Sequence, residues 1–150
     1  MIYTGYFAII RKLPENVIPI SIARWQPKWL KDNPIPVISN LAPSAELLNQ
    51  YHNLNNEEVY TKKYLSEINK YSENDILQMI NTAANTDHIE TDPKQHVMLC
   101  CYEKASDFCH RHLLAKYLNE HGLNIEEIDI EKIKAQELLK SEIKEEIEYE

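Results

Sequence analysis

Glycine is scarce in this chain, with two among 150 residues. Loops that cradle phosphates through their backbone, as in dinucleotide-binding and Walker-type motifs, need several glycines in close succession. Gly5 and Gly122 lie near opposite ends of the sequence, so neither kind of loop can be built.

Positive charge is also in deficit, because 16 Lys and Arg stand against 24 Asp and Glu, for a formal net charge of -8. We therefore expect no non-specific binding to nucleic acid. No apolar run approaches the roughly 20 residues that cross a bilayer, and the first residues lack the basic and apolar regions of a signal peptide. We expect no membrane contact.

Cysteine is limited to three residues, all between positions 100 and 109. A secreted disulfide framework would space an even number of cysteines along the chain. The cluster therefore indicates a reduced, cytoplasmic protein. The richness in Lys, Asn and Ile is a compositional indication of an AT-rich bacterial or phage genome.

Hydrophobic residues make up 43% of the chain and charged residues 27%, as in ordinary soluble domains. We expect residues 1–128 to form a single α/β domain, followed by an acidic helix over 129–150. Apolar and β-branched runs predict strands at 2–7, 17–23 and 97–102, with a last short strand within 124–128. Capping residues and helical spacing predict helices over 44–52, 55–71 and 72–84, and a helix that opens at Ser106 or Asp107 and stops at Gly122.

Residues 25–43 contain four prolines, which forbid a long helix. We expect a wrapping loop with Trp25 and Trp29 packed on the core. The alternative is that one tryptophan forms an aromatic wall for a base or sugar. From Glu131 onward the chain predicts an amphipathic helix laid on the domain, and the alternative is a homodimer contact through Leu139, Ile143 and Ile147.

Reactive side chains crowd into residues 96–112, which read as a buried strand, a loop and a helix start. Cys109 falls in the first turn of the predicted helix, where unpaired N-H groups favour anions and lower the pKa of a thiol. Arg24 leaves the second strand at its carboxyl end, where open α/β sheets bind ligands. Cys100 is expected to be a core residue, because neighbouring strand residues face opposite sides.

Three interpretations of this stretch compete. The first is recognition of a nucleotide or other anion by Arg111, the helix start and Arg24. The second is nucleophilic catalysis by Cys109 or Cys101, assisted by His110. The third is a metal site that adds His112 to the cysteines and His110; we predict no metal and no cofactor, because the spacing matches no structural zinc pattern and Cys109 and His110 should point different ways on a helix.

Glu103 follows the buried strand at its carboxyl edge. It can serve as a general base or as an acceptor for a sugar hydroxyl. Alternatively, it orients Arg111 through a salt bridge.

The run Leu99-Cys-Cys-Tyr-Glu-Lys, followed by Phe108-Cys-His-Arg-His-Leu-Leu-Ala115, resembles the signature of the domain-of-unknown-function family numbered 488. The resemblance spans residues 2 to about 128 and departs from the family at Ile22, where an Asp is often found. It implies a small three-layer, Rossmann-like α/β fold with a mostly parallel sheet. Carried over by position, it implies a site of Thr4, Arg24, Cys101, Glu103, Cys109, His110 and Arg111.

These observations predict an enzyme-like domain that binds a nucleotide or another anionic small molecule at the carboxyl edge of the sheet. Hydrolysis or glycosyl transfer is the expected chemistry, with Glu103, Cys109 or Cys101 as the reacting group and Thr4, Arg24, His110 and Arg111 as ligand-binding residues. The alternatives are a non-catalytic ligand-binding or sequestering protein and an interaction module that uses the acidic C-terminal helix.

Overall fold

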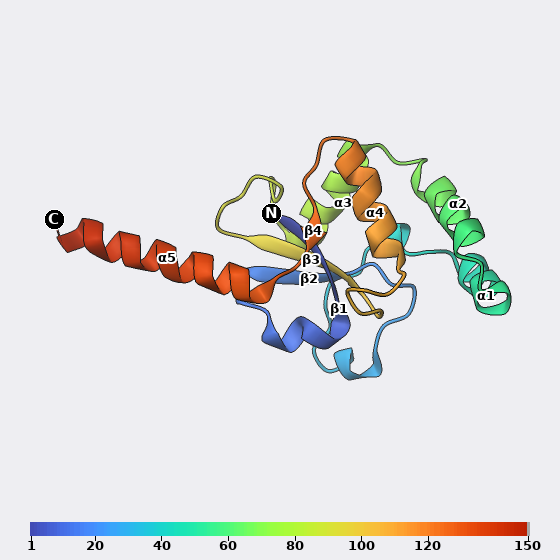
Figure 1. The fold of residues 1–150 in the computed structure, drawn as a ribbon, viewed down its shortest axis with the longest axis horizontal. Coiled ribbons are helices and arrows are strands. Elements are labelled where there is room, and N and C mark those ends of the chain that lie inside the picture. Colours follow the sequence, from blue (N-terminus) through green and yellow to red (C-terminus); the bar gives the residue numbers. More distant parts are fainter. Residues whose placement is uncertain (150) are drawn as a thin grey trace.

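Four parallel strands form the central sheet of the computed structural model, which describes residues 1–149 (Figure 1). Their order across the sheet is β2-β3-β1-β4, with β1 at Ile2–Tyr6, β2 at Val17–Ser21, β3 at His96–Cys101 and β4 at Glu126–Glu127. Since every pairing is parallel, all carboxyl ends meet at one edge. The prediction of an α/β domain with a mostly parallel sheet and a C-terminal helix is confirmed.

Strand β3 lies at the centre of the sheet, and all six of its residues are buried. Its continuous apolar sequence fits a strand that is covered on both faces. Val97 and Leu99 point to one face, whereas Met98 and Cys100 point to the other. Cys100 is therefore a core residue, as expected.

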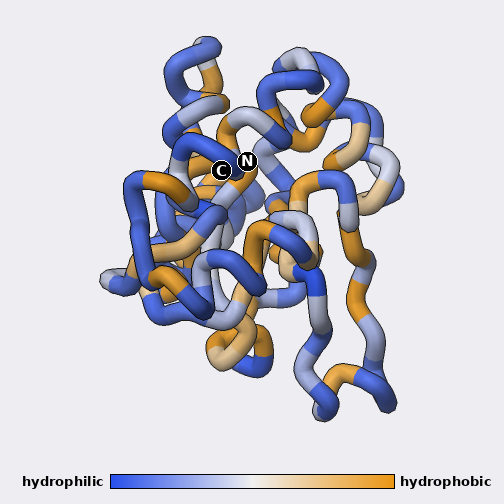
Figure 2. The backbone as a smooth tube through the Cα atoms, turned by 90° about the vertical axis from the view of Figure 1, so that its right-hand side faces the viewer, coloured by the Kyte–Doolittle hydropathy of each residue, from blue (hydrophilic) through white to orange (hydrophobic). Residues whose placement is uncertain are grey.

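Helices cover the Val97 face of the sheet (Figure 1). Helices α3 (Glu73–Ala84) and α4 (His110–Glu120) pack on the strands, α2 (Glu57–Ile68) packs on α4, and α1 (Ala45–Leu54) packs on α2. In Figure 2 hydrophobic and hydrophilic segments alternate along the coiled parts of the backbone, as expected of amphipathic helices on a core.

The opposite face carries a thinner layer, made by the 3-10 helix η1 (Phe7–Lys12), neighbouring loop residues and the start of α5 (Ile130–Tyr149). Two further 3-10 turns, η2 (Lys28–Leu30) and η3 (Ser39–Leu41), interrupt the proline-rich segment. The connection from β1 to β2 crosses this face, while those from β2 to β3 and from β3 to β4 run over the helical face.

The start of α4 differs from the prediction. Cys109 is the N-cap, with an extended backbone (φ -155°, ψ 147°), and the helix begins at His110 rather than after Ser106 or Asp107. The reason is the packing of Phe108, whose ring lies 5.7 Å from Tyr51 and 5.4 Å from Tyr60, measured between centroids. These contacts hold Phe108 against α1 and α2 and keep the preceding residues out of the helix.

The tryptophans do not pack on the core, so that expectation was wrong. Trp25 is 66% exposed and Trp29 is 42% exposed. Smaller residues fill the core positions of this segment, namely Leu30, Ile38 and Leu41. Trp29 instead lies under the Arg11 guanidinium, whose carbon is 5.2 Å from the ring centroid, a cation–π arrangement.

Helix α5 projects away from the domain (Figure 1), so the expectation that it lies along the surface was also wrong. Its first turn is anchored by the buried Ile133, and Lys140 Nζ donates to the Pro93 carbonyl at 3.3 Å two turns further on. Leu139, Ile143 and Ile147 are all exposed. None of the helices among residues 1–149 combines the length and the hydropathy that a membrane-spanning segment needs.

Candidate functional site

A cavity of about 170 Å³ opens at the carboxyl edge of the sheet. Its boundary is formed by the end of β3, the start of α4, the segment after β2 and one side of helices α1 and α2. Ligands of open α/β sheets bind at this edge. The fold therefore brings together, around one hollow, segments that are up to 87 positions apart, from Ala23 to His110.

Aromatic side chains form the walls of this cavity. Tyr51 and Tyr60 lie with ring centroids 4.9 Å apart, and Phe108 packs against both. Trp25 and Tyr102 add two further rings at the more exposed side. Burial, followed by the nearby charge of Glu103, raises the pKa of Tyr60, so its phenol stays protonated at neutral pH.

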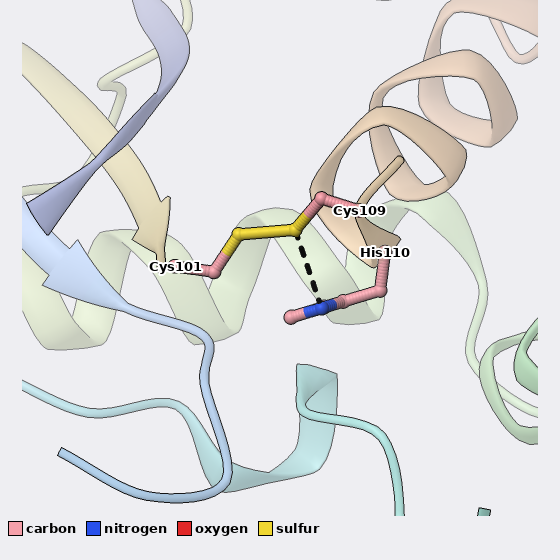
Figure 3. Close-up of side chains that lie close together, drawn as sticks. All are labelled: Cys101, Cys109 and His110. Carbon is pink, nitrogen blue, oxygen red and sulfur yellow. Dashed lines mark hydrogen bonds between the residues drawn. A yellow bond between two sulfur atoms is a disulfide. The ribbon is translucent and has the colours of Figure 1, made fainter. Parts of the chain in front are cut away.

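The floor of the cavity consists of Cys101, Cys109 and His110 (Figure 3). The two cysteine sulfurs are joined as a disulfide, so the expectation of a reduced cluster was wrong for this pair, and their Cα atoms are 7.8 Å apart. Cys109 Sγ lies 3.6 Å from His110 Nδ1. The expectation that Cys109 and His110 point different ways was wrong, because Cys109 precedes the helix and its extended backbone turns the thiol toward the ring.

His110 has a defined tautomer. Its Nε2 lies 2.6 Å from the carbonyl oxygen of Ile22, and since a carbonyl only accepts, Nε2 must carry the proton. Nδ1 then presents a lone pair to the cysteines. Burial lowers the pKa of His110 to about 4, so the ring is neutral at physiological pH.

Arg111 lies behind the cavity rather than in its lining, and its side chain has no exposed surface. Its Nε donates to Glu127 Oε1 at 3.1 Å and its Nη2 to Oε2 at 2.9 Å. Its Nη1 donates to Cys101 Sγ at 2.9 Å. In the structure Glu127, and not Glu103, is therefore the carboxylate that orients Arg111.

Thr4 belongs to the same buried group, since its hydroxyl donates to Glu127 Oε1 at 2.7 Å. Although burial acts to raise the pKa of Glu127, the hydrogen bonds from Arg111 and Thr4 bring it below its ordinary value. Glu127 was missed by the sequence analysis. Its position in the short strand that pairs with Thr4 is a signal that becomes readable only when the sheet order is known.

Arg24 and Glu103 stand at the mouth of the cavity. Arg24 Nε donates to the Pro43 carbonyl at 2.9 Å, and its Nη2 lies 3.4 Å from two further carbonyl oxygens. Glu103 is exposed, and its charge contributes to raising the pKa values of Tyr51 and Tyr60, behind burial as the main cause. The mouth therefore carries one charge of each sign.

The structure brings five of the seven predicted site residues to one cavity, namely Arg24, Cys101, Glu103, Cys109 and His110. Thr4 and Arg111 lie beneath Cys101, in the buried group with Glu127. The groups around the cavity can bind a ring between aromatic walls, contact an anion at the mouth and hold a soft metal ion at the floor.

The parallel sheet, with helices packed on it, defines the class of open α/β domains, and reactive side chains gather at its carboxyl edge. Within this class, the chain belongs to the DUF488 family: the family model described as the active DUF488-N3 subclade matches residues 10–122. The matched range includes the cavity floor and mouth but neither Thr4 nor Glu127. No curated protein and no solved structure shows a significant match to the chain.

Proposed function

We propose that this cavity is the active site of an enzyme that acts on a nucleotide or another anionic small molecule. The observation that carries the proposal is that Arg24, Glu103 and the Cys109-His110 pair border a single hollow. Membership in a subclade described as active agrees with it. Hydrolysis or glycosyl transfer is the chemistry that we assign to the cavity, because the Glu103 carboxylate can act as a general base.

The size and lining of the cavity suggest how such a ligand lies. Ligand pockets usually enclose about 300–1,000 Å³, whereas this cavity holds about 170 Å³. It therefore suits one ring, such as a base or sugar, with the anionic group left at the mouth. Arg24 uses Nε and Nη2 for carbonyl oxygens, and its Nη1 is outside those hydrogen bonds.

Glu103 is the better candidate for the reacting group. In a Cys-His mechanism, His110 would take the proton of Cys109, but the pKa of this histidine is about 4. A histidine kept neutral by burial is a weak acceptor for that proton. An exposed carboxylate at the mouth needs no such transfer and can act on a glycosidic bond or on water.

Two alternative functions are also open to this chain, one at the same cavity and one at α5. The same aromatic cavity would serve a non-catalytic protein that binds or sequesters the ligand. An interaction module would instead use the exposed residues of α5, including Leu139, Ile143 and Ile147.

The test is turnover of a panel of nucleotides and sugar phosphates by the reduced, full-length chain, followed by chromatography. Glu103→Gln should abolish turnover, while Glu120→Gln, which changes an exposed carboxylate at the other end of α4, should not. Cys109→Ser tests the thiol. Thermal stabilisation by a ligand without turnover would favour the binding protein. Absence of both turnover and thermal stabilisation would overturn the proposal.

A further inference from the structure

The floor of the cavity has the composition of a metal site. We propose that the reduced chain binds one zinc-type divalent ion through Cys101 Sγ, Cys109 Sγ and His110 Nδ1, with a fourth coordination position open to the cavity. Thiolate and imidazole ligands together favour zinc among the common divalent ions. This inference goes beyond the proposed function, because it holds whatever reaction the cavity performs.

The spacing of the three ligand atoms fits one ion. All three lie within 4.8 Å of one another. In a tetrahedral zinc site, bonds of about 2.3 Å to sulfur and about 2.0 Å to nitrogen place a sulfur and a nitrogen about 3.5 Å apart. Cys109 Sγ and His110 Nδ1 are 3.6 Å apart. This pair is therefore already at the ligand–ligand distance.

The backbone spacing of the cysteines also suits an ion between them. Disulfides usually join Cα atoms about 4.4–6.8 Å apart, and the Cα atoms of Cys101 and Cys109 are 7.8 Å apart. Reduction of the disulfide by a thiol or phosphine takes up two electrons and two protons and gives two thiols. On binding the ion, each thiol releases its proton to solvent and contributes a thiolate.

Groups behind the ligands hold them in their binding forms. Metal-bound histidines usually donate their other N-H to a carbonyl or carboxylate, and His110 Nε2 is held in this way by the Ile22 carbonyl at 2.6 Å. Burial keeps the ring neutral. Arg111 Nη1 donates to Cys101 Sγ at 2.9 Å, which stabilises a thiolate.

The charges of this arrangement balance. Two thiolates neutralise a divalent ion, and Glu127 neutralises the buried Arg111. Burying charge is costly unless it is compensated nearby. Among the described residues, no fourth His, Cys, Asp or Glu joins the three-residue cluster. Three protein ligands with one open position are the pattern of catalytic rather than structural zinc sites.

The experiment uses Co²⁺ as a spectroscopic probe. The reduced, metal-free, full-length chain is titrated with Co²⁺ in the presence of a phosphine reductant. We expect one equivalent to give thiolate-to-cobalt charge-transfer absorption and the visible bands of a tetrahedral ion, both displaced by Zn²⁺. Cys109→Ser and His110→Gln should weaken binding about 100-fold or more, whereas Cys100→Ala, which changes the buried free cysteine outside the three-residue cluster, should bind as the wild type does.

A second measurement on the unaltered chain guards against variants that fail to fold. Bound Zn²⁺ should protect Cys101 and Cys109 from alkylation, as mapped by peptide mass spectrometry, and a chelator should remove the protection. Absence of both the cobalt bands and the protection would overturn the inference, as would cobalt bands that persist unchanged in Cys109→Ser. Metal binding without turnover would leave the inference standing and count against the proposed function.

Discussion

Arg111 and Glu127 form a two-bond ion pair in which the arginine side chain has no exposed surface and the glutamate side chain is 24% exposed. The bonds run from Nε to Oε1 and from Nη2 to Oε2, at 3.1 and 2.9 Å. The pair links α4 to β4 and supplies the cation that contacts Cys101. It is therefore both a structural tie and the support of the cavity floor.

Removing the Glu127 carboxylate should lower the free energy of unfolding. Glu127→Gln leaves a buried, uncompensated guanidinium, and breaking such a pair typically costs about 3–5 kcal/mol. Glu126→Gln is the matched control, because Glu126 and Lys132 form an exposed pair at 3.8 Å, which is worth about 1 kcal/mol or less. Urea unfolding of both variants provides the measurement. If Glu127→Gln and Glu126→Gln lose the same stability, the buried Arg111–Glu127 pair contributes no more than an exposed pair.

Acid should destabilise the metal-free protein through His110. The pKa of its ring is about 4 in the folded chain, mainly because of burial, and about 6.5 in an unfolded chain. Between these values the unfolded state binds more protons, so the free energy of unfolding rises with pH across this window and falls as pH is lowered from about 6.5 to about 4. The full difference corresponds to about 3 kcal/mol.

His110→Gln isolates this contribution, since glutamine can donate to the Ile22 carbonyl but does not titrate. Urea unfolding is measured at several pH values between about 4 and 8, with chelator and reductant present. The variant should show a shallower pH dependence than the wild type in that window. If the free energy of unfolding has the same pH dependence in both proteins, His110 is not the source of the acid destabilisation.

Gly5 provides space for the buried side chain of Met98, on the face of the sheet that η1 and the start of α5 cover. A Cβ at this position would lie 2.9 Å from Met98 Cγ and 3.3 Å from Ile128 Cγ2, and Met98 is fully buried. Gly5→Ala should therefore destabilise the chain by about 1–3 kcal/mol. The cost should shrink when Met98→Ala is already present, because the two positions share one space. Additive effects in a thermal or urea double-mutant cycle would argue against this clash.

In helix α5, a buried residue at the start should contribute far more to stability than an exposed residue near the end. Ile133 is 2% exposed, whereas Ile143 is 48% exposed. Ile133→Ala should cost about 2–5 kcal/mol, as usual for a buried aliphatic residue, and Ile143→Ala should change stability by about 0.5 kcal/mol or less.

The Ile143→Ala variant also tests the homodimer that the sequence offers as an alternative. Sedimentation of the wild type over a range of concentrations reports its mass. A mass that rises with concentration, and no longer does so in Ile143→Ala, would support self-association through the stripe of Leu139, Ile143 and Ile147. A constant monomer mass would contradict self-association through α5.

Much of the fold could be predicted from local patterns. The run from Val97 to Cys101 has no polar residue and is buried in the sheet centre, and Ser72 with Asp75 forms the capping box that the sequence indicates. Such features depend on neighbours in the chain. The family signature also allowed four cavity residues to be predicted, because they occur within one short segment: Cys101, Glu103, Cys109 and His110.

The parts of the fold and site that the sequence did not predict depend on contacts between distant segments. Cys109 precedes the helix because Phe108 packs on α1 and α2, which no local spacing reveals. Glu127 reaches Arg111 only because β4 pairs with β1. Trp25 is exposed because smaller residues occupy the core, and composition favoured the opposite outcome. Position in a sheet order and competition for core space are non-local properties.

The aromatic walls and the reactive floor come from different parts of the chain. Tyr51 and Tyr60 belong to α1 and α2, whereas Cys101, Cys109 and His110 belong to the end of β3 and the start of α4. Helix α1 packs on α2, which in turn packs on α4. Under the proposed function, selectivity for a substrate can therefore diverge by substitutions in α1 and α2 while the reactive floor stays unchanged, which makes these two helices the natural place to re-engineer what the cavity accepts.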